Sequence, residues 1–117
     1  MCRKARKRPD RPADDQCAVQ LVAVPTALPA SDHATLIARK MIPVRAFENQ
    51  IFLAYANHCG ADDLFSYAGL SAIAAPDGSL LAEADGAGET LLMADIHPED
   101  FAASKAANPY LRDLRNR

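Results

Sequence analysis

The chain has 117 residues, of which 50% are hydrophobic and 24% are charged, a composition that suits one small folded domain and excludes a chain disordered throughout. No apolar run reaches the roughly 18 residues that span a membrane, and no apolar segment follows the charged N-terminus as it does in a secretory signal. Three irregularly spaced cysteines do not form a disulfide framework. We therefore expect a cytoplasmic protein with no membrane partner.

The charge is distributed unevenly along the chain. Residues 1–12 carry six basic side chains and one acidic side chain, whereas the formal net charge of the whole chain is −2. A basic arm on an acidic body can indicate nucleic-acid contact. However, this segment has no aromatic residue, no helical periodicity and two prolines, which disfavours nucleic-acid binding. We predict a disordered basic arm over residues 1–16, followed by a folded part over residues 17–117.

The first predicted element of the folded part is a buried strand over residues 17–24, a short apolar run that Pro25 ends. A helix should begin at about His33 after a proline-bounded loop. Either Ser31 or Asp32 can cap this helix, because each side chain carries an oxygen that accepts from the first free backbone amides.

The periodicity of this helix is visible in its apolar positions. Ile37, Met41 and Val44 recur at spacings of four and three, which marks one face of a helix. Pro43 lies inside the pattern, lacks an amide proton and crowds the preceding turn. We expect a kink or a break at Pro43, followed by a helical continuation to about Glu48.

Residues 51–56 are all apolar and include aromatic and β-branched members, which indicates a strand buried on both faces. A helix that leads into such a strand is typical of a layered α/β domain. A polar loop over residues 58–67 follows. A second strand at 70–75, a Pro-Asp-Gly-Ser turn and a partner strand at 80–84 then predict a β-hairpin.

The last predicted elements are a strand at 89–96 and a helix over about 99–107. Pro98 sits near the first turn of that helix, where its fixed backbone angle is tolerated. Taken in order, the elements predict an α/β fold: a mixed sheet with helices on one face.

Several unrelated short motifs occur in an order that is specific enough to compare with a known family. They are Val-Pro-Thr-Ala at 24–27, Arg-Ala-Phe-Glu-Asn-Gln at 45–50, Ala-Asn and Cys-Gly at 56–60, Gly-Leu-Ser at 69–71, Pro-Asp-Gly at 76–78, and Asn-Pro-Tyr-Leu at 108–111. Over residues 19–117 the chain resembles the second half of the carbon–nitrogen hydrolase (nitrilase and amidase) superfamily. The resemblance does not extend to residues 1–18.

The resemblance implies a fold and a type of partner. The family's complete fold is a longer αββα sandwich, so this chain should form a partial αββα sandwich of the nitrilase type. Half of such a sandwich leaves an apolar sheet face uncovered. We therefore expect the chain to self-associate or to pair with a full-length paralogue.

The resemblance also implies a chemistry, in which a cysteine thiolate attacks an amide, nitrile or carbamoyl carbon while a glutamate acts as base and a lysine stabilises the intermediate. Nothing in this sequence matches the motif of that glutamate or that lysine. Cys2 precedes Pro25 by about the interval expected of the nucleophile, but Arg-Lys-Ala-Arg-Lys-Arg follows it in place of the family's motif. Cys2 remains the one weak candidate nucleophile, and we assign no catalytic residue.

Other residues with reactive side chains have simpler interpretations. Cys17 begins an apolar run and should be a small core residue. Cys59 adjoins His58, but neighbours in a turn point apart, so we expect no catalytic or metal-binding pair. The histidines lack a metal-ligand spacing, and we expect no metal and no cofactor.

Three residues are candidates for a substrate-pocket wall. Thr26, Ala27 and Asn57 follow or end predicted strands, where open α/β sheets present their ligand sites. By resemblance they border the substrate pocket of a complete enzyme. The alternative is that Thr26 and Asn57 only satisfy backbone groups of the adjoining loops.

The composition changes abruptly at about residue 18, while the interval up to Val-Pro-Thr-Ala stays as the family requires. We hypothesise that residues 1–18 come from out-of-frame reading or a false start. The chain would then be the C-terminal part of a carbon–nitrogen hydrolase for small amide or nitrile substrates, inactive without its missing half. The alternative is a non-catalytic interaction or oligomerisation module.

Overall fold

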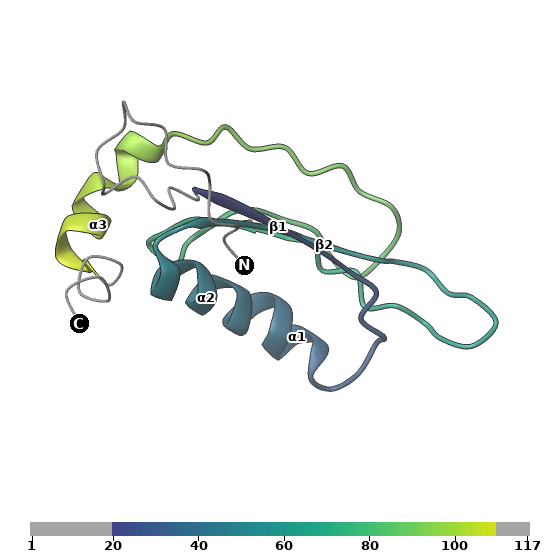
Figure 1. Cartoon of the computed structure of the whole chain (residues 1–117). Coiled ribbons are helices and arrows are strands. Elements are labelled where there is room, and N and C mark those ends of the chain that lie inside the picture. The colour runs from purple at the N-terminus through teal and green to yellow at the C-terminus, as the bar shows by residue number, and fades with distance from the viewer. Residues whose placement is uncertain (1–19, 110–117) are drawn as a thin grey trace, which may run out of the picture.

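The computed structural model describes residues 20–109, which form one sheet with a helix layer on one face (Figure 1). The strands are β1 (Leu21–Thr26), β2 (Phe52–Asn57), β3 (Ala72–Ala74) and β4 (Leu80–Glu83). They lie side by side in chain order. β1 and β2 are parallel, and the two following pairs are antiparallel. The predicted mixed sheet of an α/β fold is confirmed, whereas the predicted arm over residues 1–16 lies outside the described residues.

The helix layer is one continuous rod made of three segments: α1 (Ala34–Leu36), η2 (Ile37–Met41) and α2 (Ile42–Asn49). Its buried stripe contacts the central strands, and the core cluster consists of Ala38, Ile42, Ala46, Leu53, Tyr55 and Ala74. Small residues at the contact let the helix backbone approach the sheet closely. The central strand is buried in part as predicted, because Phe52, Leu53 and Tyr55 are each 5% exposed or less, whereas Ala56 near its end is exposed.

Pro43 neither breaks nor ends the helix, so the predicted break is wrong, and the helical continuation to about Glu48 is confirmed. The chain forms a π-helical turn just before it, in which the amide of Ile42 donates to the carbonyl of Ile37 five residues earlier. This wider turn places Pro43 in the first turn of α2, where no amide proton is required of it. The predicted side-chain cap is also wrong. The backbone carbonyl of Ser31 accepts from Ala34 at 3.2 Å, and no side chain caps α1.

The first strand ends later than predicted and its described part is not buried, while residues 17–19 of the prediction lie outside the described residues. β1 contains Pro25 and is an edge strand of the described sheet, with Leu21, Ala23 and Pro25 exposed. The carbonyls of Gln20 and Thr26 accept from the chain at the two ends of β2. The backbone amides and carbonyls of the even-numbered residues of β1 therefore face β2. The missing amide proton of Pro25 would point to the open edge, where proline costs no ladder hydrogen bond.

The hairpin of β3 and β4 is confirmed, and its turn uses Gly78 at φ +86°. The strand predicted at 89–96 does not form within the described residues. That segment is extended and passes the sheet on the side away from α2 (Figure 1). Its side chains alternate between exposed and half-buried, as in a strand, yet it has no pairing partner there; Leu91 and Met93 are 85% and 80% exposed. A strand needs a neighbour for its backbone groups, and local sequence cannot supply one.

The C-terminal helix lies close to its predicted position. A 3₁₀ turn, η3 (Pro98–Phe101), leads into α3 (Ala102–Ala107). The Phe101 ring contacts the Phe52 ring edge to face, with 5.2 Å between their centroids. Gln50 links the layers, because its amide donates to the carbonyl of Pro76 at 3.1 Å and accepts from Ser104 at 3.1 Å. No helix over residues 20–109 is long and apolar enough to cross a bilayer.

The buried hydroxyl of Tyr55 allows a test of how this core is packed. It is buried without a hydrogen-bond partner among the described residues, and an unpaired buried polar group costs free energy. We expect Tyr55→Phe to raise the free energy of unfolding by about 1 kcal/mol in urea denaturation. The matched control is Tyr67→Phe, which removes a hydroxyl that donates to Asp62 at 2.6 Å and should not stabilise the chain.

The wild type and Tyr55→Phe should also differ in how their stability depends on pH. Burial raises the pKa of Tyr55 above 10.0, and the charge of Arg39 lowers it in part. The folded state therefore favours the neutral phenol over the phenolate. The free energy of unfolding of the wild type is unaffected by this group below pH 10.0 and falls as the pH rises from there through the pKa of the folded state. The advantage of Tyr55→Phe over the wild type should grow above pH 10. A destabilised Tyr55→Phe variant would contradict the unpaired hydroxyl.

Candidate functional site

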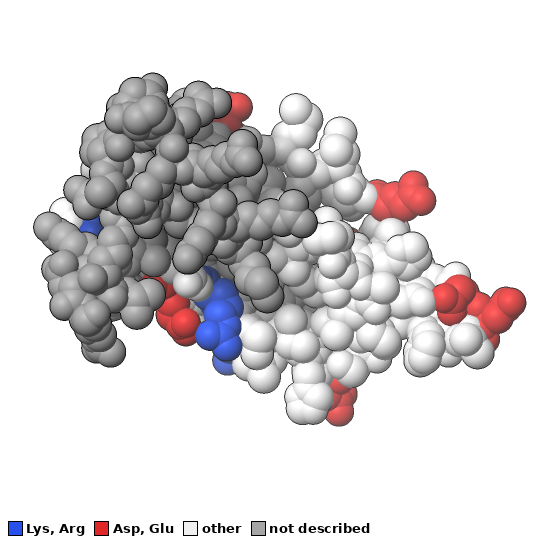
Figure 2. All heavy atoms as spheres, in the orientation of Figure 1, with Lys and Arg blue, Asp and Glu red and all other residues white. Residues whose placement is uncertain are grey.

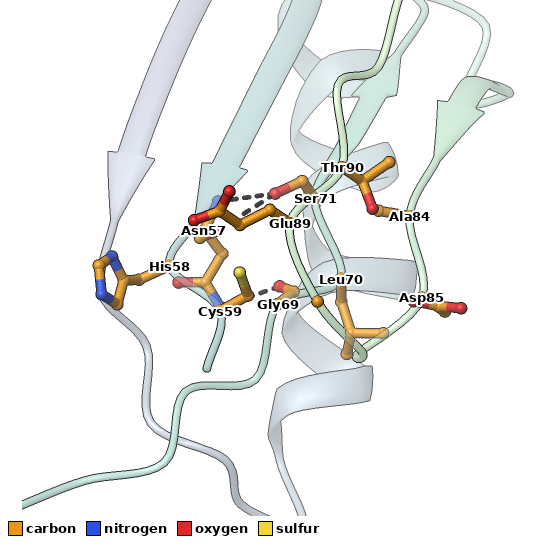
Figure 3. A pocket seen from close by; sticks show the side chains of 11 residues that line it. Asn57, His58, Cys59, Gly69, Leu70, Ser71, Ala84, Asp85, Glu89 and Thr90 are labelled. Carbon is orange, nitrogen blue, oxygen red and sulfur yellow. Dashed lines mark hydrogen bonds between the residues drawn. The ribbon is translucent and has the colours of Figure 1, made fainter. Parts of the chain in front are cut away.

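A pocket of about 320 Å³ opens where β2 ends (Figure 3). Its walls come from three segments that are distant in sequence. They are residues 57–59 at the end of β2, residues 69–71 before β3, and residues from 84 to 90 after β4. Ligands of open α/β sheets commonly bind at the carboxyl ends of strands. This pocket is therefore the candidate functional site.

Asn57 is the hydrogen-bonding centre of the pocket wall. Its Oδ1 accepts from the Leu28 amide at 2.8 Å, and its Nδ2 donates to the Gly69 carbonyl at 2.9 Å and to the Leu28 carbonyl at 3.4 Å. Its backbone amide donates to Ser71 Oγ at 2.9 Å, and that hydroxyl donates to the Asn57 carbonyl at 3.3 Å. Asn57 thus joins two loops to the end of β2, and its side chain is engaged within the protein.

The three residues predicted for the pocket wall do not all meet there. Asn57 lines the pocket, whereas Thr26 and Ala27 are not among its lining residues. Thr26 lies beside Asn57 in the β1–β2 register, and its carbonyl accepts from the His58 amide at 3.0 Å. It therefore supports the neighbouring strand end. A substrate-contacting role for these three residues stays a prediction.

Cys59 and His58 point in different directions, as expected of neighbours in a turn. In Figure 3 the Cys59 sulfur turns towards the pocket and the His58 ring turns away. The His58 ring packs edge to face against Tyr67, with 4.6 Å between the centroids. Cys59 is a free, half-buried thiol. The described residues therefore hold no thiol–imidazole pair here, and the candidate nucleophile Cys2 and the predicted core residue Cys17 lie outside residues 20–109.

The loop after Cys59 is braced by one carboxylate. Asp62 accepts from the amides of Leu64 and Phe65 at 2.9 and 2.7 Å and from the Tyr67 hydroxyl at 2.6 Å. The Tyr67 hydrogen bond is the main cause that lowers the pKa of Asp62, and the two amides lower it further. The same hydrogen bond raises the pKa of Tyr67. Acidic side chains lie at the tip of this loop (Figure 2).

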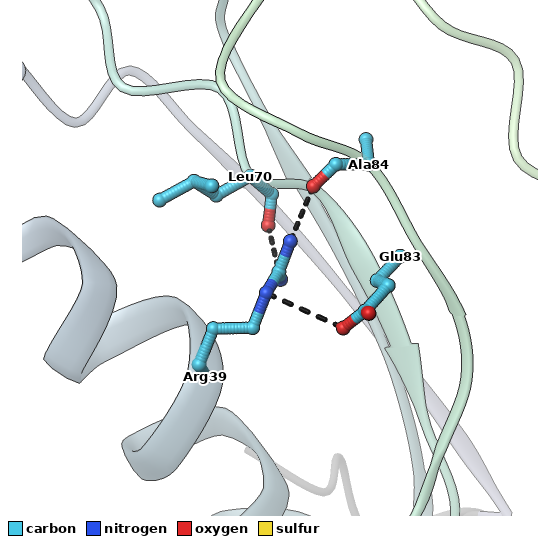
Figure 4. A network of polar contacts seen from close by, with 4 residues as sticks. All are labelled: Arg39, Leu70, Glu83 and Ala84. Carbon is cyan, nitrogen blue, oxygen red and sulfur yellow. Dashed lines mark hydrogen bonds and ion pairs between the residues drawn. The ribbon is translucent and has the colours of Figure 1, made fainter.

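The sequence alone did not single out Arg39, which reaches from the helix to the back of the pocket wall (Figure 4). Its guanidinium donates to the carbonyls of Leu70, at 2.9 Å, and Ala84, and it pairs with Glu83 at 3.4 Å. The available sequence signal was the position of Arg39 on the predicted helix, directly after Ala38. The structure shows that Ala38 is buried. Its carbonyl partners lie 31 and 45 residues away and leave no local pattern.

Metal chemistry has no support within the described part of the chain. No group of three or more His, Cys, Asp or Glu residues between residues 20 and 109 is placed to hold a metal ion. The pocket side chains that carry charge or a thiol are Asp85, Glu89, His58 and Cys59. Together they line a mixed polar and apolar cavity that can accept a small polar molecule.

Comparison with known proteins finds a family that includes the pocket residues. The family model described as carbon–nitrogen hydrolase matches residues 28–106. A relative described as "Hydrolase in pqqF 5'region" from Pseudomonas protegens is 43% identical over 98 residues, which are 82% of this chain and 33% of the relative.

Two solved structures of an amidase from Nesterenkonia sp. AN1 have the same fold. A mutant with the acetamide moiety of fluoroacetamide added covalently at its active-site cysteine is 36% identical, with a TM-score of 0.63 over 81% of this chain and 35% of that one. A mutant in complex with butyramide is 38% identical, with a TM-score of 0.61 over 80% and 34% of the two chains. The chain thus spans about one third of the length of these relatives, and its sheet and helix layer are part of the αββα fold of the nitrilase type.

Asn57 can be tested by removing its side-chain amide. Asn57→Ala leaves the Leu28 amide and the Gly69 carbonyl without their partner, so we expect the free energy of unfolding to fall by about 2 kcal/mol in urea denaturation. The control is Asn49→Ala, at an exposed position whose amide donates to Arg45 and to no other group between residues 20 and 109. It should change stability by less than about 0.5 kcal/mol. Equal effects of the two variants would show that Asn57 does not organise the wall.

Proposed function

The chain belongs to the carbon–nitrogen hydrolase family, and on that premise we propose that it forms one wall of the substrate pocket of a hydrolase for small amides. The bond cleaved is a carbon–nitrogen bond other than a peptide bond. The observation that carries this proposal is the pocket at the end of β2, whose wall is built from residues 57–59 and 69–71 within the matched region.

The size of the pocket and the relatives both support amides as substrates. A volume of about 320 Å³ is large enough to hold a small molecule. The structural relative is an amidase that has been solved with butyramide and with the acetamide moiety of fluoroacetamide. Small primary amides are therefore the first substrates to test, and small nitriles are the second.

The proposed contribution of this chain is binding and orientation, without turnover. Thiolate attack on an amide needs a base close to the thiol and a donor for the oxyanion. Cys59 is the pocket thiol, but the His58 ring packs on Tyr67 and faces away from it. The sequence also matches neither the glutamate motif nor the lysine motif of the family. A reducing compartment suits the free thiol of Cys59, which is consistent with the cytoplasm.

A second candidate function is that of an interaction module, supported by exposed apolar surface. The extended segment over residues 89–97 has no strand partner within the described residues, and its Leu91 and Met93 are almost fully exposed. β1 adds an exposed edge with Leu21 at 48%. Figure 2 shows broad uncharged surface over the described part of the molecule. Surfaces of this kind favour association with a second copy or with a longer relative.

The amide proposal predicts binding without hydrolysis. The purified chain should release no ammonia from acetamide, butyramide or acetonitrile above the buffer rate. Butyramide should shift the NMR signals of the Asn57 and Gly69 amides and leave those of the hairpin turn at Gly78 unchanged. Ammonia release that a thiol-blocking reagent abolishes would contradict the proposed inactivity. If no amide or nitrile shifts the pocket signals, the pocket has been misassigned.

The association proposal predicts a mass above the 12.6 kDa of one chain. In sedimentation equilibrium the weight-average mass should rise with concentration. The double variant Leu91→Lys/Met93→Lys should lower it, because charges on an apolar contact must be desolvated. Leu64→Lys is the matched control, since Leu64 is 82% exposed on the loop tip. A wild type that stays monomeric at all concentrations would end this second candidate.

A further inference from the structure

Leu70 in the pocket wall has an unusual backbone conformation. Its φ is +61°, in the left-handed region, and Gly69 before it has φ +64°. A left-handed leucine is disfavoured because its Cβ crowds the following carbonyl. Gly69 also has no room for a side chain, since an added Cβ would lie 3.3 Å from the Asp85 carbonyl. The pocket wall therefore turns at Leu70 through a backbone conformation that leucine disfavours.

Four hydrogen bonds hold this turn from different directions, and in one of them the Gly69 carbonyl accepts from Asn57 Nδ2 at 2.9 Å. The Gly69 amide donates to the His58 carbonyl at 3.0 Å, and the Leu70 amide donates to the Asp85 carbonyl at 3.2 Å. The Leu70 carbonyl accepts from Arg39 at 2.9 Å. Two of the four come from side chains, and of these only the bond from Arg39 carries a charge, which strengthens a hydrogen bond.

Arg39 connects two of the three segments of the pocket wall from outside the pocket. One guanidinium nitrogen donates to the Leu70 carbonyl and the other to the Ala84 carbonyl (Figure 4). Leu70 and Ala84 both line the pocket, whereas Arg39 does not. Glu83 pairs with the third nitrogen at 3.4 Å and directs the planar fork of donors.

We propose that Arg39 is a positioning residue for the pocket: it holds Leu70 in its left-handed conformation and keeps residues 69–71 against residues 84–90. The shape of the pocket then depends on a side chain that touches no ligand. The use of that shape for small amides rests on the function proposed above. Lysine cannot replace arginine here, because one ammonium group cannot present two coplanar donors to two carbonyls.

The test compares Arg39→Lys with the double variant Arg39→Lys/Leu70→Gly by residue-resolved hydrogen exchange of the full chain. Glycine adopts the left-handed conformation without strain, so it should remove the need for Arg39. The reporters are the amides of Gly69 and Ala84, which donate to His58 and Ser71. The reference is the Phe52 amide, which donates to Gln20 at the far end of β2. Arg45→Lys, on the exposed side of the same helix, is the control.

We expect Arg39→Lys to speed exchange of the two reporters by about tenfold or more and to leave Phe52 at the wild-type rate, as in local opening. The double variant should return the reporters to near the wild-type rate. Alkylation of Cys59 by iodoacetamide, followed in its own peptide by mass spectrometry, should rise and fall in parallel. Arg45→Lys should match the wild type in every measurement.

Two results would overturn the role of Arg39. One is equal acceleration of the reporters and Phe52, which indicates general destabilisation. The other is a double variant that exchanges like Arg39→Lys or fails to fold, because relief of strain at Leu70 would then not compensate. Butyramide titration of the wild type reports separately on the proposed function. Absence of binding there, with the exchange pattern as expected, would remove the amide assignment and leave the positioning role intact.

Discussion

Close packing of the helix on the central strand is the constraint on which the rest of the structure depends. Ala38 and Ala46 are 1% and 0% exposed, and they let the helix rest directly against β2 and β3. This contact places β2 in the middle of the sheet, with β1 beside it in parallel. The end of β2 is consequently held in place, and Asn57 is presented where three loops converge.

The pocket depends on polar side chains that join segments distant in sequence. Asn57 connects the end of β2 to loops that begin near Leu28 and Gly69, and Arg39 connects the helix to Leu70 and Ala84. Each satisfies backbone groups that would otherwise be unpaired at the ends of strands. The pocket wall is therefore held by hydrogen bonds, whereas the layer beneath it is held by apolar packing.

Membership of the carbon–nitrogen hydrolase family and the exposed apolar surface bear on each other. The match covers most of this chain but about one third of its relatives. The segment that carries Leu91 and Met93 alternates in exposure like a strand but has no strand partner among residues 20–109. Glu89 and Thr90 at the start of this segment also line the pocket, so the pocket wall and the exposed segment are continuous in the chain.

The sequence by itself determined the elements whose signals are local: the apolar run of β2, the Pro-Asp-Gly-Ser hairpin turn, the helix before β2, and Asn57 at a strand end. Short-range periodicity and turn chemistry suffice to locate these elements. The face of the helix was wrong, because Met41 and Val44 of the predicted apolar face are 45% and 51% exposed while Ala38 and Ala46 contact the sheet. Only the tertiary structure decided that Pro25 lies in an edge strand of the described sheet, that a π-helical turn accommodates Pro43, and that residues 89–96 have no strand partner among residues 20–109. It also brought Arg39 to Leu70. The strand pairing and the contact of Arg39 depend on which groups meet across 30 or more residues, and such pairing leaves no periodic trace in a single sequence. The π-helical turn is local, but the periodicity of the helix does not reveal it.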